Sequence, residues 1–213
     1  MSDGLRVLVA DDHEVVRRGL VEMLGDEYPY ASFGQAADSG AALELACQGG
    51  WDLMVMDLSM PGRGGLEVLA DLHKLVPRLP VLILSMHPET EYAVRSIRAG
   101  ASGYVHKGSV SAELLHAVRK VLSGNRYISP ELAELLASDL GKLKQRTPHE
   151  TLSDREYEVM KLIATGLSVK EIAAKLGLSD KTVFTYRSRM LEKLGLNGDV
   201  EVARYALQHK LVD

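Results

Sequence analysis

The chain has 213 residues, of which 46% are apolar, and a formal net charge of −4. This length fits one large domain or two small ones. We expect neither a secretory leader nor a membrane span, because the apolar run at 5–10 is interrupted by Arg6 and ends at two aspartates, far short of the roughly 20 apolar residues that a span needs. The single cysteine, Cys47, excludes an internal disulfide and a cysteine zinc site. These features predict a protein of the reducing cytoplasmic compartment.

The charge is divided unevenly along the chain. Residues 1–124 contain 11 Lys and Arg against 16 Asp and Glu, a net −5, whereas residues 125–213 contain 14 against 13, a net +1. Such a difference favours two domains with different partners. Because DNA-binding domains are often far more basic than +1, a nucleic-acid function must be argued from where the basic residues lie.

Short β-type runs alternate with amphipathic stretches along residues 1–124. We expect strands at 6–10, 32–37, 53–56, 81–84 and 103–106, with helices between them, for example at 13–24 and 65–76. This alternation predicts crossover connections, and therefore a parallel sheet with helices on both faces. The runs VLVA, LMVM and VLIL are apolar throughout, as is typical of central strands that are buried on both faces.

A linker is expected at residues 125–151, after Gly124 and Asn125 end this first unit. Within it, a helix is predicted near 130–143, with Ser129 as N-cap and Pro130 as the first helical residue. Helical periodicity resumes at Leu152 and continues to the end, so residues 152–213 are predicted to form a second, all-α domain.

Charged and polar residues follow four of the five predicted strands. Asp11 and Asp12 follow the first strand, Asp57 the third, Ser85 the fourth and Lys107 the fifth. In an open parallel sheet, ligands bind outside the carboxyl ends of the strands. These side chains, which are distant in the sequence, are therefore expected to lie together at one edge of the sheet.

Three neighbouring carboxylates repel one another, and a divalent cation with oxygen ligands, such as Mg²⁺, relieves that repulsion. A carboxylate can also attack phosphorus and form an aspartyl phosphate, while a cation and a lysine neutralise the transferring group. Asp57 is the best candidate nucleophile because it begins the loop DLSMPGRGG. The alternative is that Asp11 and Asp12 only cap the helix that follows them.

The segments VLVADDH, MDLSMPGRGG, LILS and GYVHKG resemble the receiver domain of two-component response regulators, which has a flavodoxin-like fold with five parallel strands. The resemblance covers residues 5–122. It implies that Asp57 accepts a phosphoryl group from a sensor histidine kinase and that Asp12 and Asp57 bind Mg²⁺ directly. Asp11 would act mainly through water, and the carbonyl of Ser59 would be a further metal ligand.

The same resemblance implies a switch. Ser85 would donate a hydrogen bond to the phosphoryl group, Lys107 would pair with it, and Tyr104 would turn inward when Ser85 moves. The alternative for Tyr104 is a half-buried strand aromatic. His87 stands two places after Ser85, where several receivers carry another residue; it either tunes hydrolysis of the phosphoryl group or is a solvated residue at a helix start.

The second domain contains two adjacent helical patterns. The run LSDREYEVMKLIATG begins with a capping box, in which Ser153 is the N-cap and Glu156 follows three residues later. In LSVKEIAAKLGLSDKTVFTYRSRMLEKLG, two helices are separated by Gly177 and Leu178, and Ser179 caps the second. Two helices joined by a tight glycine turn form the helix-turn-helix pattern.

The second of these helices has one apolar and one polar side. At 100° per residue, Val183, Met190 and Leu194 form a narrow core stripe. Residues 180–194 carry four basic and two acidic side chains, and the outward side offers groups for phosphates and base edges. An exposed phenylalanine argues against a purely solvated face. The predicted DNA-contacting residues are Lys181, Thr182, Phe184, Thr185, Tyr186, Arg187, Ser188, Arg189 and Lys193.

The stretch 152–211 closely resembles the four-helix DNA-binding domain of LuxR type, so the chain is similar to the NarL/FixJ family of response regulators. Phe184 and Tyr186 replace the commoner Lys and His, and the Tyr-Arg-x-Arg pattern is more similar to the branch of GacA, UvrY and BvgA. The resemblance implies binding to double-stranded promoter DNA as a homodimer when phosphorylated. The last helix, 200–208, would form a dimer contact between DNA-binding domains.

Two other classes of function remain open. An aspartyl phosphatase would need a second catalytic acid two residues after its nucleophile, where this chain has Ser59. A regulator that binds DNA without phosphorylation is disfavoured by the complete set of acids. The expected function is therefore that of a phosphoacceptor which takes part in its own phosphorylation and dephosphorylation, rather than that of a classified enzyme.

Overall fold

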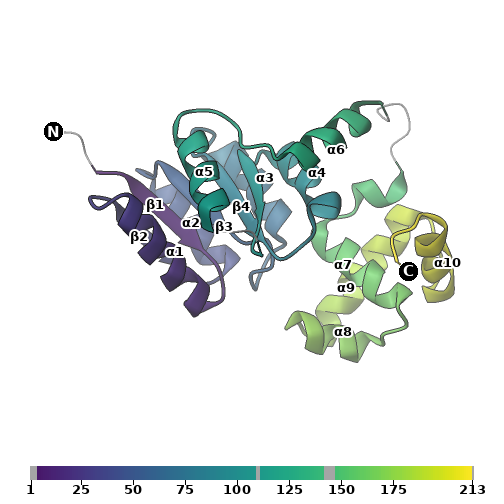
Figure 1. Cartoon of the computed structure of the whole chain (residues 1–213). Helices are drawn as coiled ribbons and strands as arrows, with labels where there is room; N and C mark the ends of the chain where they lie inside the picture. Colours follow the sequence, from purple (N-terminus) through teal and green to yellow (C-terminus); the bar gives the residue numbers. More distant parts are fainter. Residues whose placement is uncertain (1–3, 109–110, 142–146, 213) are drawn as a thin grey trace. The chain divides into compact units, whose positions relative to one another are not determined.

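The structure, a computed structural model, describes residues 4–108, 111–141 and 147–212. The chain forms two compact units, Met1–Gly141 and Lys142–Asp213. The first contains a sheet covered by helices, and the second is entirely helical (Figure 1). No helix among the described residues is long and apolar enough to cross a membrane.

The first unit is built on five parallel strands in the order β2-β1-β3-β4-β5. This is the order of the flavodoxin-like fold, in which the strand order reverses between β1 and β3. The strands are β1 (Arg6–Ala10), β2 (Ser32–Ala36), β3 (Leu53–Met56), β4 (Val81–Ser85) and β5 (Gly103–His106).

The predicted strands are confirmed to within one residue. The second strand ends at Ala36, one residue earlier than expected, and the fourth includes Ser85, which we expected just after it. Strands β3 and β4 are buried along their whole length, as their continuous apolar runs predicted.

Helices cover both faces of the sheet (Figure 1). Val7 and Val9 of β1 pack in one core cluster with Leu20 of α1 and Val118 of α5, while α2, α3 and α4 pack side by side on the other face. The helices of this unit that run between strands, or follow the last one, are α1 (Glu14–Glu27), α2 (Ser39–Gln48), α3 (Gly65–Leu75), α4 (Glu89–Ala99) and α5 (Ser111–Leu122).

The helix α6 (Pro130–Gly141) begins where the sequence predicts. Ser129 Oγ accepts the backbone N–H of Leu132 at 3.0 Å, which is the bond that an N-cap makes. The expected extension to residue 143 lies outside the described residues. α6 packs against α4 and belongs to the first unit, although we had placed it in a linker. The domain limits at 124 and 152 stay predictions.

In the second unit, residues 147–212 form a short 3-10 helix and four α-helices. The predicted capping box is confirmed at the start of α7: Ser153 Oγ accepts from Glu156 N, and the Glu156 carboxylate accepts from Ser153 N. The elements are η1 (Pro148–Thr151), α7 (Asp154–Ala164), α8 (Val169–Leu176), α9 (Asp180–Leu194) and α10 (Asp199–Gln208). The helices α8 and α9 are the predicted helix-turn-helix pair.

Candidate phosphoacceptor site and DNA-binding helix

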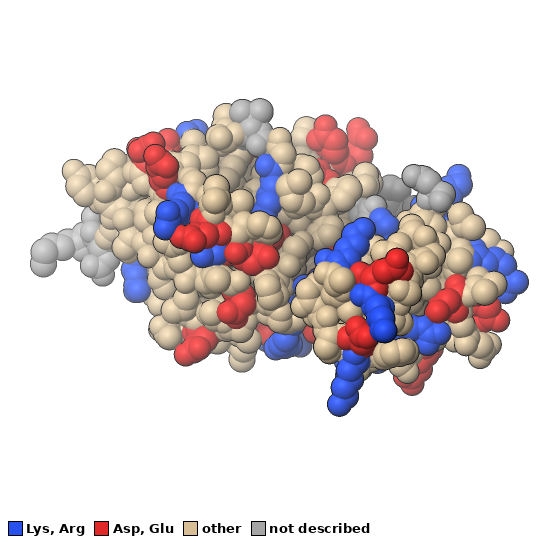
Figure 2. Space-filling view, turned by 90° about the horizontal axis from the view of Figure 1, so that it is seen from below, with Lys and Arg blue, Asp and Glu red and all other residues tan. Residues whose placement is uncertain are grey.

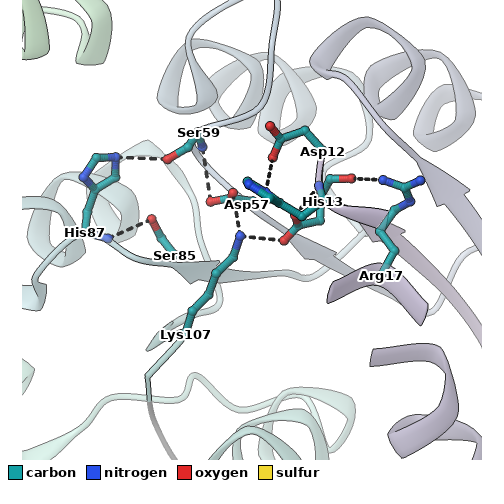
Figure 3. Close-up of polar contacts among 9 residues, drawn as sticks. Asp12, His13, Arg17, Asp57, Ser59, Ser85, His87 and Lys107 are labelled. Atoms are coloured by element: carbon teal, nitrogen blue, oxygen red, sulfur yellow. Dashed lines mark hydrogen bonds and ion pairs between the residues drawn. The ribbon is translucent and has the colours of Figure 1, made fainter. Parts of the chain in front are cut away.

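Three of the predicted strand-end residues meet at the carboxyl edge of the sheet (Figure 3). Lys107 Nζ lies 2.7 Å from Asp57 Oδ2 and 2.6 Å from Asp11 Oδ2. Asp11 and Asp57 are buried, and the Lys107 side chain is 9% exposed. Residues that are 46 to 96 positions apart in the sequence thus form one charged cluster, because β1, β3 and β5 all end at this edge of the sheet.

The cluster keeps Lys107 protonated. Burial of the ammonium lowers the pKa of Lys107, but the hydrogen bonds to Asp11 and Asp57 and the charges of both carboxylates outweigh burial, so the pKa is raised above its ordinary value. A lysine that stays charged at this position can neutralise negative charge that develops on a group attached to Asp57.

Asp11 does not act as the N-cap of α1. That position is held by His13, whose side chain makes no capping bond, while Asp11 Oδ1 accepts the backbone N–H of His13 at 2.9 Å. The other oxygen of Asp11 points toward Lys107. The carboxylate therefore both supports the start of α1 and contributes charge to the site, so the alternative of capping alone is insufficient.

The acidic residues have the donor set of a divalent-cation site. Asp11, Asp12, His13 and Asp57 each offer one ligand atom, and these atoms lie within 4.8 Å of one another. Asp12 Oδ1 is buried and lacks a hydrogen bond, although His13 Nδ1 lies 2.8 Å from it. Carboxylate oxygens that lie this close together fit a hard cation that prefers oxygen ligands. His13 was missed by sequence reasoning, although it directly follows the two aspartates.

His87 joins the two loops that follow β3 and β4. Its Nε2 lies 3.1 Å from Ser59 Oγ, and its backbone N–H donates to Ser85 Oγ at 3.2 Å (Figure 3). Its carbonyl accepts the hydroxyl of Tyr104 at 2.6 Å, and its ring stacks on Tyr92 with 4.1 Å between centroids. Position 87 is therefore held at its ring, its N–H and its carbonyl, which its sequence spacing alone did not reveal.

Tyr104 is fully buried, not half-buried. Its hydroxyl reaches the carbonyl of His87, so the aromatic residue predicted to act in the switch contacts the loop that directly follows Ser85. Ser59, the other predicted loop residue, donates its backbone N–H to Asp57 Oδ1 at 3.2 Å. The two oxygens of Asp57 are thus oriented by Ser59 on one side and by Lys107 on the other.

The helix α9 has the two sides that its sequence predicts. Val183, Met190 and Leu194 are buried in the helical unit. Lys181, Thr185, Ser188 and Arg189 are exposed, and Phe184 is 55% exposed. Thr182 lies at the cap instead, where its backbone N–H donates to Ser179 Oγ at 3.1 Å and the two hydroxyls are 2.8 Å apart.

Two of the four basic residues of α9 form ion pairs within the unit. Arg187 Nε donates to Asp199 Oδ1 of α10 at 2.8 Å, and Lys193 Nζ donates to Glu156 Oε2 of α7 at 2.6 Å. Glu156 is buried, so Lys193 compensates a charge inside the domain. Lys181 and Arg189 have no acidic partner among the described residues.

Charges of both signs alternate over the helical unit in Figure 2, in agreement with its small net charge. The face of this unit seen in Figure 2 has no large patch of purely positive or purely negative charge. Positive charge must therefore be supplied locally, by individual side chains of α9.

A second capping box, at Ser168 and Glu171, starts α8. We missed it, although its S-x-x-E spacing is readable in the sequence.

Comparison with known proteins gives two family matches. Residues 7–119 match the model described as response regulator receiver domain, and residues 150–206 match the model described as bacterial regulatory proteins, luxR family. The chain is 40% identical over 210 residues to the response regulator GacA of Pseudomonas aeruginosa, covering 98% of each chain. It is 38% identical over 208 residues to the response regulator UvrY of Escherichia coli, covering 97% of this chain and 95% of the relative.

Among solved structures, the chain is similar to RcsB from Salmonella enterica serovar Typhimurium bound to the promoter rprA in the presence of the phosphomimetic BeF3−. The TM-score is 0.60 at 26% identity, with 95% of this chain and 98% of that chain covered. A second similar structure is the response regulator ChrA of a heme-sensing two-component system, with a TM-score of 0.51 at 32% identity, covering 99% of this chain and 100% of that chain.

Proposed function

This chain belongs to the two-component response regulators that join a receiver domain to a LuxR-type DNA-binding domain, and on that premise we propose that phosphorylation of Asp57 controls its binding to promoter DNA. A sensor histidine kinase in the cytoplasm would supply the phosphoryl group. The observation that carries the proposal is the contact of Asp57 with Lys107 and, through that lysine, with Asp11.

Transfer of the phosphoryl group to Asp57 forms one bond to phosphorus and breaks another. A carboxylate oxygen of Asp57 attacks phosphorus, while the bond from phosphorus to the nitrogen of the phosphorylated kinase histidine breaks and its electron pair stays on nitrogen. Lys107 remains protonated and neutralises the incoming charge, and Ser85 donates its hydroxyl to a phosphoryl oxygen. Asp11, Asp12 and Asp57, with the carbonyl of Ser59, would hold Mg²⁺, which supplies further charge neutralisation when bound.

We propose that α9 is the helix that binds double-stranded DNA. Helix-turn-helix domains place their second helix in the major groove, and the exposed side of α9 carries the groups for this contact. Phe184, Thr185 and Ser188 are the candidates for base edges, whereas Lys181 and Arg189 are the cations without an acidic partner among the described residues. The proposed set of DNA-contacting residues is completed by four neighbours at the border of this exposed side, Thr182, Tyr186, Arg187 and Lys193.

The homodimer is part of the proposal. α10 buries Val202 and Ala206, while Val200 is 84% and Leu207 56% exposed. These two exposed residues are seven apart and share one side of the helix, which would suit an isologous contact between two DNA-binding domains. We propose a receiver domain at 1–124, a linker at 125–151 and a DNA-binding domain at 152–213.

The proposal is tested by labelling the full chain with acetyl phosphate and Mg²⁺ and mapping the label by mass spectrometry. We expect it on Asp57, and we expect Asp57→Ala to abolish it while Asp52→Ala, an exposed acid near the opposite end of β3, retains it. Full labelling of Asp57→Ala would refute the assignment. A genome-wide DNA-binding profile that is identical for wild type and Asp57→Ala would favour regulation without phosphorylation.

A further inference from the structure

The chain folds back onto the sheet after α5. Tyr127 donates its backbone N–H to the carbonyl of Ser102 at 2.8 Å and forms an isolated parallel bridge with Gly103. A Cβ at Gly103 would lie 2.9 Å from the Cβ of Tyr127, so only glycine permits this approach. The Tyr127 hydroxyl donates to Glu113 Oε1 of α5 at 2.9 Å. The segment that leads into α6 is therefore attached to the edge of the sheet beside β5.

The start of α6 is attached to the start of α4. Ser129 is 5% exposed, and its hydroxyl donates to Glu89 Oε2 at 2.7 Å while it caps α6 through Leu132 N. Leu132 is fully buried where α6 packs against α4. Glu89 is the first residue of α4, and its carboxylate is the acceptor in a polar contact between the two helix starts.

The start of α4 is also attached to the phosphoacceptor site. Pro88 is the N-cap of α4, and His87 precedes it. His87 contacts Ser59 through its ring and Ser85 through its backbone N–H. An unbroken series of contacts thus runs from Asp57 through Ser59 and His87 to Glu89, and from there to the N-cap of α6.

From this series we propose that the hydrogen bond between Glu89 and Ser129 couples the phosphoryl group on Asp57 to the docking of α6, so that phosphorylation loosens α6 from α4. The proposal rests on the proposed function of Asp57 and adds the route by which that site reaches the segment before the DNA-binding unit.

The direction follows from the contacts of Ser85. Its hydroxyl accepts the N–H of His87 in the unmodified protein, and it must approach Asp57 to donate to a phosphoryl oxygen. His87 is bound to Ser85, Ser59 and Tyr104, so its backbone follows, and a shift of Glu89 two residues later would lengthen the 2.7 Å hydrogen bond to Ser129. A packed contact that has two arrangements can transmit such a shift.

Coupling of this kind is reciprocal: if phosphorylation loosens α6, loosening α6 must favour the phosphorylated state by the same factor. Two measurements therefore test one quantity. Hydrogen–deuterium exchange of the backbone amides of α6 reports docking. The dissociation constant of beryllofluoride, a phosphoryl mimic, in the presence of Mg²⁺ reports the site.

The variants are chosen so that folding of α6 and its docking are separated. Ser129→Asp keeps an N-cap acceptor but places a second carboxylate against Glu89. The double variant with Glu89→Lys restores an attractive pair at the same place. Thr90→Ala, an exposed neighbour on α4, is the matched control.

We expect beryllofluoride to speed exchange in α6 of the wild type at least about five-fold. Ser129→Asp should exchange at the fast rate without the mimic and should bind it more tightly by the same factor. The charge-reversed double variant and Thr90→Ala should behave like the wild type.

The proposal is overturned if beryllofluoride protects the loop after β3 but leaves exchange in α6 unchanged, or if Ser129→Asp binds the mimic with wild-type affinity. If the mimic protects no residues of that loop in the wild type, it is instead the assignment of Asp57 as phosphoacceptor that fails.

Discussion

At the scale of single residues, charge balance in the phosphoacceptor site depends on Lys107. Its ammonium contacts two buried carboxylates, and those contacts raise its pKa in spite of burial. A group whose pKa is raised by folding stabilises the protein below its ordinary pKa, and that contribution is lost as the pH rises through the raised value.

We predict that Lys107→Met lowers the free energy of unfolding by about 1–3 kcal/mol at pH 7 in metal-free buffer, because two carboxylates lose a charged donor. The deficit should stay constant up to about pH 10, near the ordinary lysine pKa, and shrink above it. Urea unfolding from pH 7 to 11 measures this. Lys74→Met, at an exposed lysine of α3, should match wild type, and a deficit that grows with pH would contradict the assignment.

Asp12 carries the second prediction at this scale. Its buried Oδ1 lies 2.8 Å from His13 Nδ1 and beside the other acids. Asp12→Asn should weaken Mg²⁺ binding at least about ten-fold, since even changes outside the ligand shell cost that much. An NMR titration of backbone amides gives the affinity. Asp26→Asn, on the exposed side of α1, serves as control, and unchanged Mg²⁺ affinity in Asp12→Asn would remove it from the ligand set.

At the scale of elements, α9 combines two kinds of basic residue. Lys193 compensates the buried Glu156 and Arg187 pairs with Asp199, so both help to hold α9 against α7 and α10. Lys181 lies at the exposed start of the helix. The basic residues of α9 look equivalent in the sequence, but they therefore differ in how readily they can contact a DNA phosphate.

We predict opposite effects of Lys181→Ala and Lys193→Ala. Lys181→Ala should leave stability unchanged and lower the salt dependence of DNA binding by about one unit, the effect of one lost phosphate contact. Lys193→Ala should cost about 1 kcal/mol of stability with a smaller change in salt dependence. Thermal unfolding and binding across a salt series separate the two. Equal effects on both measurements would show that the ion pair does not distinguish them.

Phe184 is the informative residue for sequence reading. An aromatic ring carries no charge and cannot form an ion pair with a phosphate, but it can contact the methyl group of thymine. Phe184→Ala should therefore lose about 1–3 kcal/mol on a specific duplex, relax preference at one position, and keep the salt dependence of wild type. Binding to specific and random duplexes decides this. If Phe184→Ala and Lys181→Ala both bind like wild type on both duplexes, α9 is not the reading helix.

At the scale of the whole molecule, two units with different chemistry are joined in one chain. The receiver unit, residues 1–141, contains 12 Lys and Arg against 19 Asp and Glu, a net −7, whereas the helical unit, residues 142–213, contains 13 against 10, a net +3. Weak positive charge limits the non-specific part of DNA affinity, which comes mainly from phosphate contacts. The proposed dimer would compensate for this by reading two half-sites, because linked binding events strengthen each other.

We therefore predict that phosphorylation promotes dimers on DNA. Sedimentation of the full chain on an isolated operator, with and without beryllofluoride and Mg²⁺, should show one chain per operator in the unmodified state and two in the activated state. Asp57→Ala should not respond to the mimic. A chain that stays monomeric on DNA under both conditions would contradict the prediction.

Local patterns of sequence were enough to predict the strands and the residues that form the charged cluster at the carboxyl edge of the sheet. Alternation of short apolar runs with amphipathic stretches reports burial on one or two faces, so it predicts parallel strands and helices before any contact is known. Because parallel strands end at a common edge, Asp11, Asp57 and Lys107 had to meet. The cap of α7 at Ser153 is likewise a matter of residues three positions apart.

Contacts between distant elements were decided only by the tertiary structure. Glu89 and Ser129 are 40 residues apart, and Lys193 and Glu156 are 37 apart; no periodicity relates their positions. Whether such side chains meet depends on how one helix packs against another, which the pattern of each helix leaves undetermined. For that reason the sequence was enough to predict the acidic site and the helix that we propose to read DNA, whereas the docking of α6 and the different partners of the basic residues of α9 required the fold.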